Sequence, residues 1–225
     1  APFRSIVAIT IPILSRAWKD KDTKEIGRIY QRSSINLLCF SLFVFILIWI
    51  NFSNAISFFF FYSEYLIGKW VFFIMGLVTI IEMGTGVNSQ IIGTSTYWRF
   101  ELWTSLLLTA LIIPLSYTLT VKFGIIGPAL SNLISFIFYN LVRIWFLWKK
   151  FRLQPFTSKT IEVLLFAALA YFVTYLVFNN NTGLVTMVGS SALFGLLFIA
   201  AVYFRNISPD VKPVIESVLK RFSGK

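Results

Sequence analysis

Long apolar runs separated by short polar connections dominate the sequence. The runs fall at residues 35–53, 66–92, 99–120, 127–149, 159–178 and 184–204. Each is close to the roughly 20 residues that an α-helix needs to cross the hydrocarbon core of a bilayer. Residues 1–14 have the pattern of the end of a further membrane helix. The pattern predicts an all-α fold, a polytopic bundle of transmembrane helices.

The connection at residues 15–34 differs from the others because it is basic, polar and long enough to hold structure of its own. Asp22 or Thr23 is suited to cap a short amphipathic helix there, with Ile26 and Tyr30 on one face of that helix. We therefore expect residues 15–34 to form a cytoplasmic amphipathic connection.

Composition agrees with a membrane protein. Of the 225 residues, 57% are hydrophobic and 13% are charged, whereas a soluble domain carries roughly 25% charged residues. The sequence contains no His, and Cys39 is its one cysteine, so an internal disulfide and Cys/His metal sites are excluded. No nucleophile elbow, catalytic triad or phosphate loop is present. We therefore expect no catalytic residues, no metal and no cofactor. The protein is not expected to be an enzyme.

The net charge is +11, and most of the basic residues that produce it lie in the connections between the apolar runs and in the tail. Lys and Arg gather in residues 15–34, in 149–159 and in the tail 205–225, whereas 54–65 and 179–183 carry none. By the positive-inside rule, the basic connections and the tail are cytoplasmic. Membrane topology therefore explains the charge, and no nucleic-acid partner is expected.

The chain begins with Ala1 inside an apolar stretch that no basic segment precedes. This start is unlike that of a signal peptide. We therefore expect the sequence to be a fragment whose N-terminal part is missing.

A charge within an apolar run is costly and therefore a candidate for function, and three such residues stand out. Arg4 and Glu82 each lie about 11 residues, or roughly 16 Å, from the predicted cytoplasmic end of their helix. Such residues can pair with each other, face a water-filled cavity, or contact an anionic substrate group. Arg143 is about six residues from its cytoplasmic end, so we expect its side chain to reach the interface and to have a structural role.

The run that contains Glu82 is unusually polar for a membrane helix. Asn88 and Gln90 follow Glu82, and Thr85, Ser89 and Gly93 recur every four residues to give one small face. In one interpretation this face packs closely against another helix. In the other, the polar positions form the wall of a cavity, and Asn88 and Gln90 then join Arg4 and Glu82 as candidates for substrate binding.

Four sequence segments together resemble a known family. These are residues 12–18 (PILSRAW), 29–33 (IYQRS), 88–99 (NSQIIGTSTYWR) and 123–129 (FGIIGPA). They resemble the C-terminal part of a bacterial polysaccharide flippase of the multidrug/oligosaccharidyl-lipid/polysaccharide (MOP) exporter superfamily. The resemblance covers essentially the whole chain.

The resemblance implies the C-terminal part of a MATE-like MOP flippase fold. Residues 1–14 would be the end of a truncated membrane helix, 35–149 four helices of the C-terminal bundle, and 159–204 two additional helices, with the cytoplasmic tail at 205–225. The location implied is the bacterial inner membrane, with several membrane passes.

The implied substrate is an oligosaccharide carried on undecaprenyl diphosphate, moved from the inner to the outer leaflet for surface polysaccharide, O-antigen and lipopolysaccharide biosynthesis. A central cationic cavity would accept the diphosphate, and Arg4 suits that role by charge and depth. The expected partners are this lipid-linked oligosaccharide, the lipid bilayer and polysaccharide polymerases.

Three other functions remain open. A cation-coupled multidrug antiporter of the same superfamily would use Glu82 as a proton or sodium site. A membrane glycosyltransferase or polymerase is disfavoured because the predicted outer loops are short and Glu64 is their one acid. A structural membrane partner without transport is the third alternative.

Overall fold

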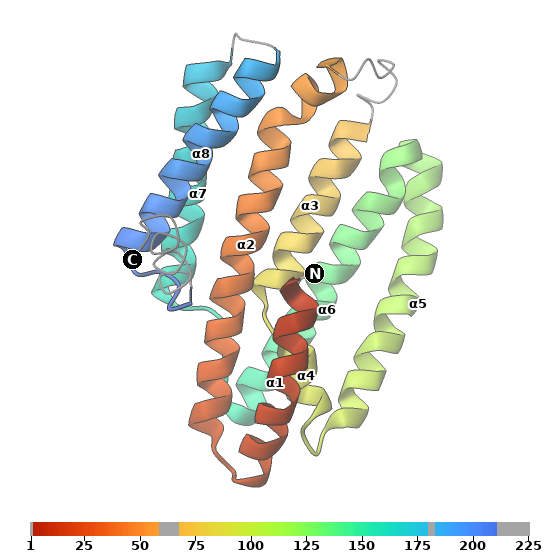
Figure 1. Ribbon diagram of the computed structural model, residues 1–225. Helices are drawn as coiled ribbons and strands as arrows, with labels where there is room; N and C mark the ends of the chain where they lie inside the picture. Colours follow the sequence, from red (N-terminus) through yellow and green to blue (C-terminus); the bar gives the residue numbers. More distant parts are fainter. Residues whose placement is uncertain (1, 59–67, 180–182, 211–225) are drawn as a thin grey trace. The chain divides into compact units, whose positions relative to one another are not determined.

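The protein is helical throughout the part that the structure describes. The computed structural model describes residues 2–58, 68–179 and 183–210, which form helices and connecting turns without a strand (Figure 1). The predicted all-α class is therefore confirmed for these residues. Of the predicted tail 205–225, residues 211–225 lie outside the described residues.

Eight α-helices and one 3₁₀ turn follow one another in this part of the chain. They are α1 (Pro2–Lys19), α2 (Thr23–Phe58), α3 (Gly68–Gly84), α4 (Asn88–Gly93), α5 (Trp98–Phe123), the 3₁₀ turn η2 (Gly124–Ile126), α6 (Gly127–Phe151), α7 (Ser158–Phe178) and α8 (Leu184–Phe204).

Four of the described helical segments are long and apolar enough to cross a membrane. They are Thr23–Phe58, Trp98–Phe151, Ser158–Phe178 and Leu184–Phe204, of which the second contains both α5 and α6. Large apolar side chains on these segments face outward: Trp103 is 70% exposed, Val185 86% and Leu196 71%. Such surfaces are costly in water and suited to lipid.

The amphipathic helix predicted within residues 15–34 is not separate. Helix α1 continues to Lys19, and α2 begins at Thr23 and runs without interruption to Phe58. The predicted cap is present, because the Asp22 carboxylate accepts a hydrogen bond of 3.0 Å from the Glu25 N–H. The amphipathic turns therefore form the start of a helix long and apolar enough to cross a membrane, since nothing between them and the apolar run breaks the helix.

The chain divides into two compact units, and the first comprises Ala1–Leu38 and Trp70–Phe156. Its core joins α1, the start of α2, α4 and α6. The buried core residues are Leu14, Ala17, Ile26, Tyr30, Val87, Ile91, Ile92, Leu147 and Leu153. The Trp18 indole N–H, from α1, donates to the Ile91 carbonyl of α4 at 3.1 Å. The apolar face predicted for residues 23–34 thus packs inside this unit.

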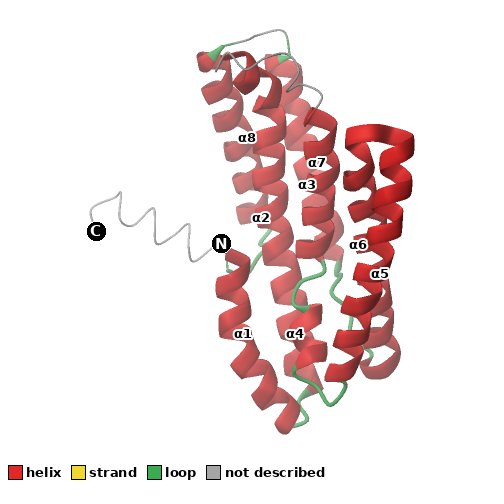
Figure 2. Ribbon diagram, turned by 90° about the vertical axis from the view of Figure 1, so that its right-hand side faces the viewer, coloured by secondary structure: helices red, strands yellow, loops and turns green. Residues whose placement is uncertain are grey.

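Helices α5 and α6 form a hairpin in the first unit and run side by side (Figures 1 and 2). A Cβ atom at Gly127 would lie 2.4 Å from the Thr120 backbone nitrogen, so this position has room for glycine alone. Further along, the Ser131 hydroxyl donates to the Ile112 carbonyl at 3.1 Å. Small residues on α6 therefore allow the two backbones to approach closely.

The second unit comprises Cys39–Lys69 and Thr157–Lys225. Its described part packs α2 against α8 through Phe43, whose ring centroid lies 5.9 Å from that of Phe194 and 6.0 Å from that of Phe198. Nearby, the Asn51 amide donates to the Ser191 hydroxyl at 2.9 Å. Aromatic packing and a hydrogen bond between side chains thus hold the two helices together.

Candidate functional site

The predicted membrane run 66–92 is broken in the structure, which corrects the expectation of one continuous helix. Residues 66–67 lie outside the described residues, α3 ends at Gly84, and α4 begins at Asn88 (Figure 2). Gly86 has a φ of +66°, a left-handed conformation that interrupts an α-helix. The small face proposed for Thr85, Ser89 and Gly93 therefore does not run along a single helix.

Helix α2 stabilises this break. A Cβ atom at Gly86 would lie 2.8 Å from the Ser33 hydroxyl and 2.9 Å from the Ser34 nitrogen, so the turn lies directly against α2. The Ser34 hydroxyl donates to the Gly84 carbonyl, and the Val87 N–H donates to the Ser33 hydroxyl at 3.3 Å. A broken helix in lipid must satisfy its freed backbone groups within the protein. The two serines do this for the turn between α3 and α4.

Asn140 of α6 binds the opposite side of the break. Its side-chain oxygen accepts hydrogen bonds from the Thr85 hydroxyl at 2.9 Å and from the Asn88 amide at 3.0 Å. Its own amide donates to the Phe136 carbonyl at 2.9 Å. All three polar side chains are buried, so the amide of Asn140 links the two sides of the break to α6.

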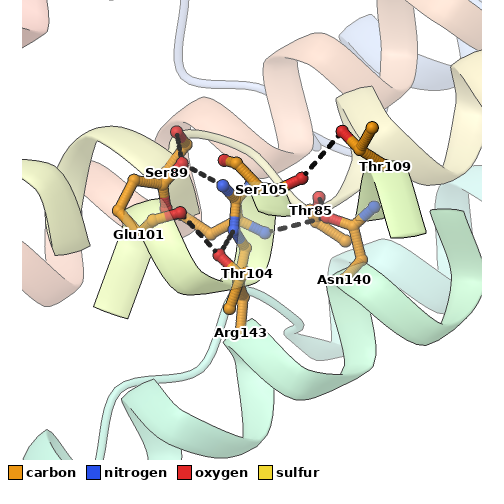
Figure 3. Close-up of polar contacts among 9 residues, drawn as sticks. Thr85, Ser89, Glu101, Thr104, Ser105, Thr109, Asn140 and Arg143 are labelled. Atoms are coloured by element: carbon orange, nitrogen blue, oxygen red, sulfur yellow. Dashed lines mark hydrogen bonds and ion pairs between the residues drawn. The ribbon is translucent and has the colours of Figure 1, made fainter. Parts of the chain in front are cut away.

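Arg143 lies one helical turn after Asn140, and its position corrects a second expectation. Instead of reaching the membrane interface, Arg143 is buried and forms an ion pair with Glu101 of α5 (Figure 3). The Ser89 hydroxyl also donates to Glu101, at 2.7 Å. Pairing inside the protein satisfies the guanidinium without moving it to the surface.

Two further contacts hold the Arg143 guanidinium. Its Nε donates to the Thr104 hydroxyl at 3.3 Å. The guanidinium carbon lies 3.7 Å from the centroid of the Tyr139 ring, in a cation–π contact. The cation is therefore held by α5 and by its own helix at once.

A cavity of about 180 Å³ lies beside the broken helix. Its lining residues are Phe3, Glu82, Gly86, Asn88, Ser89, Gln90, Tyr139, Asn140 and Arg143. Three of the four predicted site residues, Glu82, Asn88 and Gln90, are thus brought together. Arg4 is not among the lining residues; it is exposed on α1, next to Phe3, which does line the cavity.

The cavity presents polar atoms that have capacity for a ligand. The Glu82 carboxylate makes no hydrogen bond or ion pair with the residues that the structure describes. The Gln90 side-chain oxygen is buried and has no hydrogen-bond partner in the same part of the chain. Glu101 pairs with Arg143, so Glu82 is the acid of the lining that has no ion-pair partner among the described residues. A carboxylate, amides and the Tyr139 ring can bind hydroxyl groups or a cation.

The sequence analysis missed Glu101, although this residue lies within the predicted run 99–120. The available signal was an acid, Glu101, in one predicted helix and a base, Arg143, in the next predicted helix along the chain. Ser33 and Ser34 gave no comparable signal, because serines at the start of a membrane helix are common and their partners lie 50 or more residues away.

Comparison of the chain with models of protein families, with curated proteins and with solved structures finds no match.

Proposed function

We propose that the chain is part of a membrane transporter that moves an undecaprenyl-diphosphate-linked oligosaccharide from the inner to the outer leaflet of the bacterial inner membrane, for surface polysaccharide biosynthesis. One observation carries the proposal: a polar cavity lies beside a helix break, and α6, which also lines it, belongs to a segment long and apolar enough to cross a membrane. Interrupted helices beside buried polar groups are typical of substrate sites in transporters.

The lining favours the sugar portion of such a substrate. Glu82, Asn88 and Gln90 offer carboxylate and amide groups that can bind sugar hydroxyls, and Tyr139 offers a ring face. The diphosphate needs cations, and Arg143 is already neutralised by Glu101. Arg4, exposed on the helix next to the cavity, remains the residue proposed for the diphosphate.

An antiporter of the same superfamily is the second candidate, favoured by one feature. Glu82 is a carboxylate in an apolar helix without an ion-pair partner among the described residues. A proton or sodium ion binds readily to such a group.

Complementation tests the proposal. The product of the gene that encodes this chain is expressed in a bacterial strain lacking its own O-unit flippase, and surface polysaccharide is measured. We expect export to be restored, and Glu82→Gln to reduce it at least about tenfold, equivalent to roughly 1.4 kcal/mol. Glu162→Gln is the matched control, because Glu162 lies on α7 outside the cavity.

Two outcomes contradict the flippase proposal. If membrane-inserted protein restores no export with any of several O-unit types, the substrate assignment is wrong, and ion-dependent drug efflux then tests the antiporter. If Arg4→Ala leaves export unchanged, Arg4 does not bind the diphosphate.

A further inference from the structure

A second cavity, of about 400 Å³, lies between the start of α2 and the segment that follows α6. It is lined by Thr23, Lys24, Gly27, Arg28, Gln31, Arg152, Leu153 and Gln154. Three of these residues are the cations Lys24, Arg28 and Arg152, and none of the lining residues is an acid. Arg28 forms an ion pair of 2.7 Å with Glu25, which lies outside the lining. Small-molecule sites have volumes of roughly 300–1,000 Å³, so this cavity has room for a polar headgroup.

The turn after α6 shapes the cavity. Arg152 has a φ of +59°, and its N–H donates to the Trp148 carbonyl at 3.0 Å. The chain then reverses, so that Leu153 is buried against α2. A Cβ atom at Gly27 would lie 3.2 Å from the Leu153 side chain, which shows how closely the two segments pack. The cavity is therefore a built feature of the first unit.

Arg152 adopts a conformation that glycine adopts with less strain. A left-handed backbone costs a non-glycine residue about 1–2 kcal/mol, and strained residues of this kind concentrate at functional sites. The side chain placed there is a cation that lines the cavity. A role for its charge accounts for an arginine at a position where glycine would end the helix more readily.

An apolar strip on α6 leads away from these cations. Leu141, Trp145 and Trp148 lie at helical spacing and are 58%, 54% and 49% exposed. The Arg152 guanidinium carbon lies 5.7 Å from the centroid of the Trp148 ring. Tryptophan next to a cation is typical of the membrane interface. A molecule with an anionic head and an apolar tail matches this arrangement.

We propose that this cavity binds the phosphate headgroup of an anionic phospholipid of the inner leaflet, with an acyl chain along the α6 strip. The cations lie at the helix ends that the charge pattern places on the cytoplasmic side. Basic pockets between membrane helices on that side bind phospholipid headgroups. The inference does not depend on transport, since the lining is separate from the cavity beside the helix break.

Native mass spectrometry of the purified chain tests the proposal. The protein is titrated with phosphatidylglycerol and, separately, with phosphatidylcholine, and bound lipid is counted. We expect preferential binding of phosphatidylglycerol. Arg152→Gly and Arg28→Gln should each weaken it about fivefold, as expected for one cation near a lipid surface. Arg152→Gly also relieves the strained backbone, so we expect this variant to remain folded.

Arg99→Gln is the matched control, because Arg99 is an exposed cation on the same predicted side but outside the cavity. Equal binding of the two lipids, or equal weakening by Arg99→Gln, would overturn the proposal. Displacement of the lipid by millimolar inorganic phosphate would show a site for free phosphate and would also overturn it. Retained binding in the Arg28→Gln and Arg152→Gly double variant would exclude this cavity.

Discussion

The ion pair between Glu101 and Arg143 offers a sharp test of how the first unit is held together. The side chains of Arg143 and Glu101 are 4% and 18% exposed, and each also bonds to another polar group, Thr104 or Ser89. Arg143→Ala would leave the Glu101 carboxylate buried without its cation. Breaking a buried pair in this way costs about 3–5 kcal/mol. We expect a loss of that size in the free energy of unfolding.

A double-mutant cycle separates the pair from its surroundings. Glu101→Gln, Arg143→Gln and the double variant are reconstituted in bicelles, and the free energy of unfolding is measured by steric trapping. Either single change leaves one charge alone, whereas the double variant leaves none. We therefore expect the double variant to lose less stability than the sum of the singles, with a coupling of about 1–3 kcal/mol.

A second ion pair in the chain provides the control. Arg205 and Glu162 lie 3.3 Å apart, with side chains 59% and 31% exposed, and such solvated pairs contribute about 0–1 kcal/mol. The same cycle at this pair should give a smaller coupling. Additive losses at Glu101 and Arg143, or equal couplings at the two pairs, would refute the assignment of a stabilising buried pair.

Further predictions concern the helix break and the hairpin, with the free energy of unfolding as the measurement. Gly86→Ala should lose at least about 2 kcal/mol, because its left-handed backbone and its contact with α2 both exclude a methyl group. Gly93→Ala, where no atom lies within 4 Å of the added methyl, should stay within about 0.5 kcal/mol and is the control. Gly127→Ala should lose about 1–3 kcal/mol by separating α5 from α6, and an unchanged stability would contradict that contact. Asn140→Ala should lose about 1–3 kcal/mol, since it leaves the Asn88 amide buried without an acceptor; full stability would show that another group replaces it.

The helices were predictable from the sequence because the signal for them is local. An apolar run of about 20 residues is sufficient to indicate a membrane helix. The gathering of Glu82, Asn88 and Gln90 was predictable for a similar reason, since the three residues lie within one short polar stretch.

The helix break and the buried ion pair depend on residues distant in sequence. The turn between α3 and α4 depends on a hydrogen bond from Ser34 to the Gly84 carbonyl, 50 residues away in sequence, and Arg143 finds its partner 42 residues away at Glu101. Apolar residues continue on both sides of the turn, so periodicity alone indicates an unbroken helix. Depth alone indicated that Arg143 reaches the surface, because counting residues does not reveal a partner on another helix.

The hydrogen bonds of the helix break also have an order in time during synthesis. Ser34, which binds the Gly84 carbonyl, is translated before the break, whereas Asn140 follows Asn88 by 52 residues. At about 5–20 residues per second, the ribosome needs roughly 3–10 s to add that stretch. During this interval the nascent break has its α2 partner but not its α6 partner. The Asn88 amide therefore has no acceptor on α6 until that helix has been synthesised.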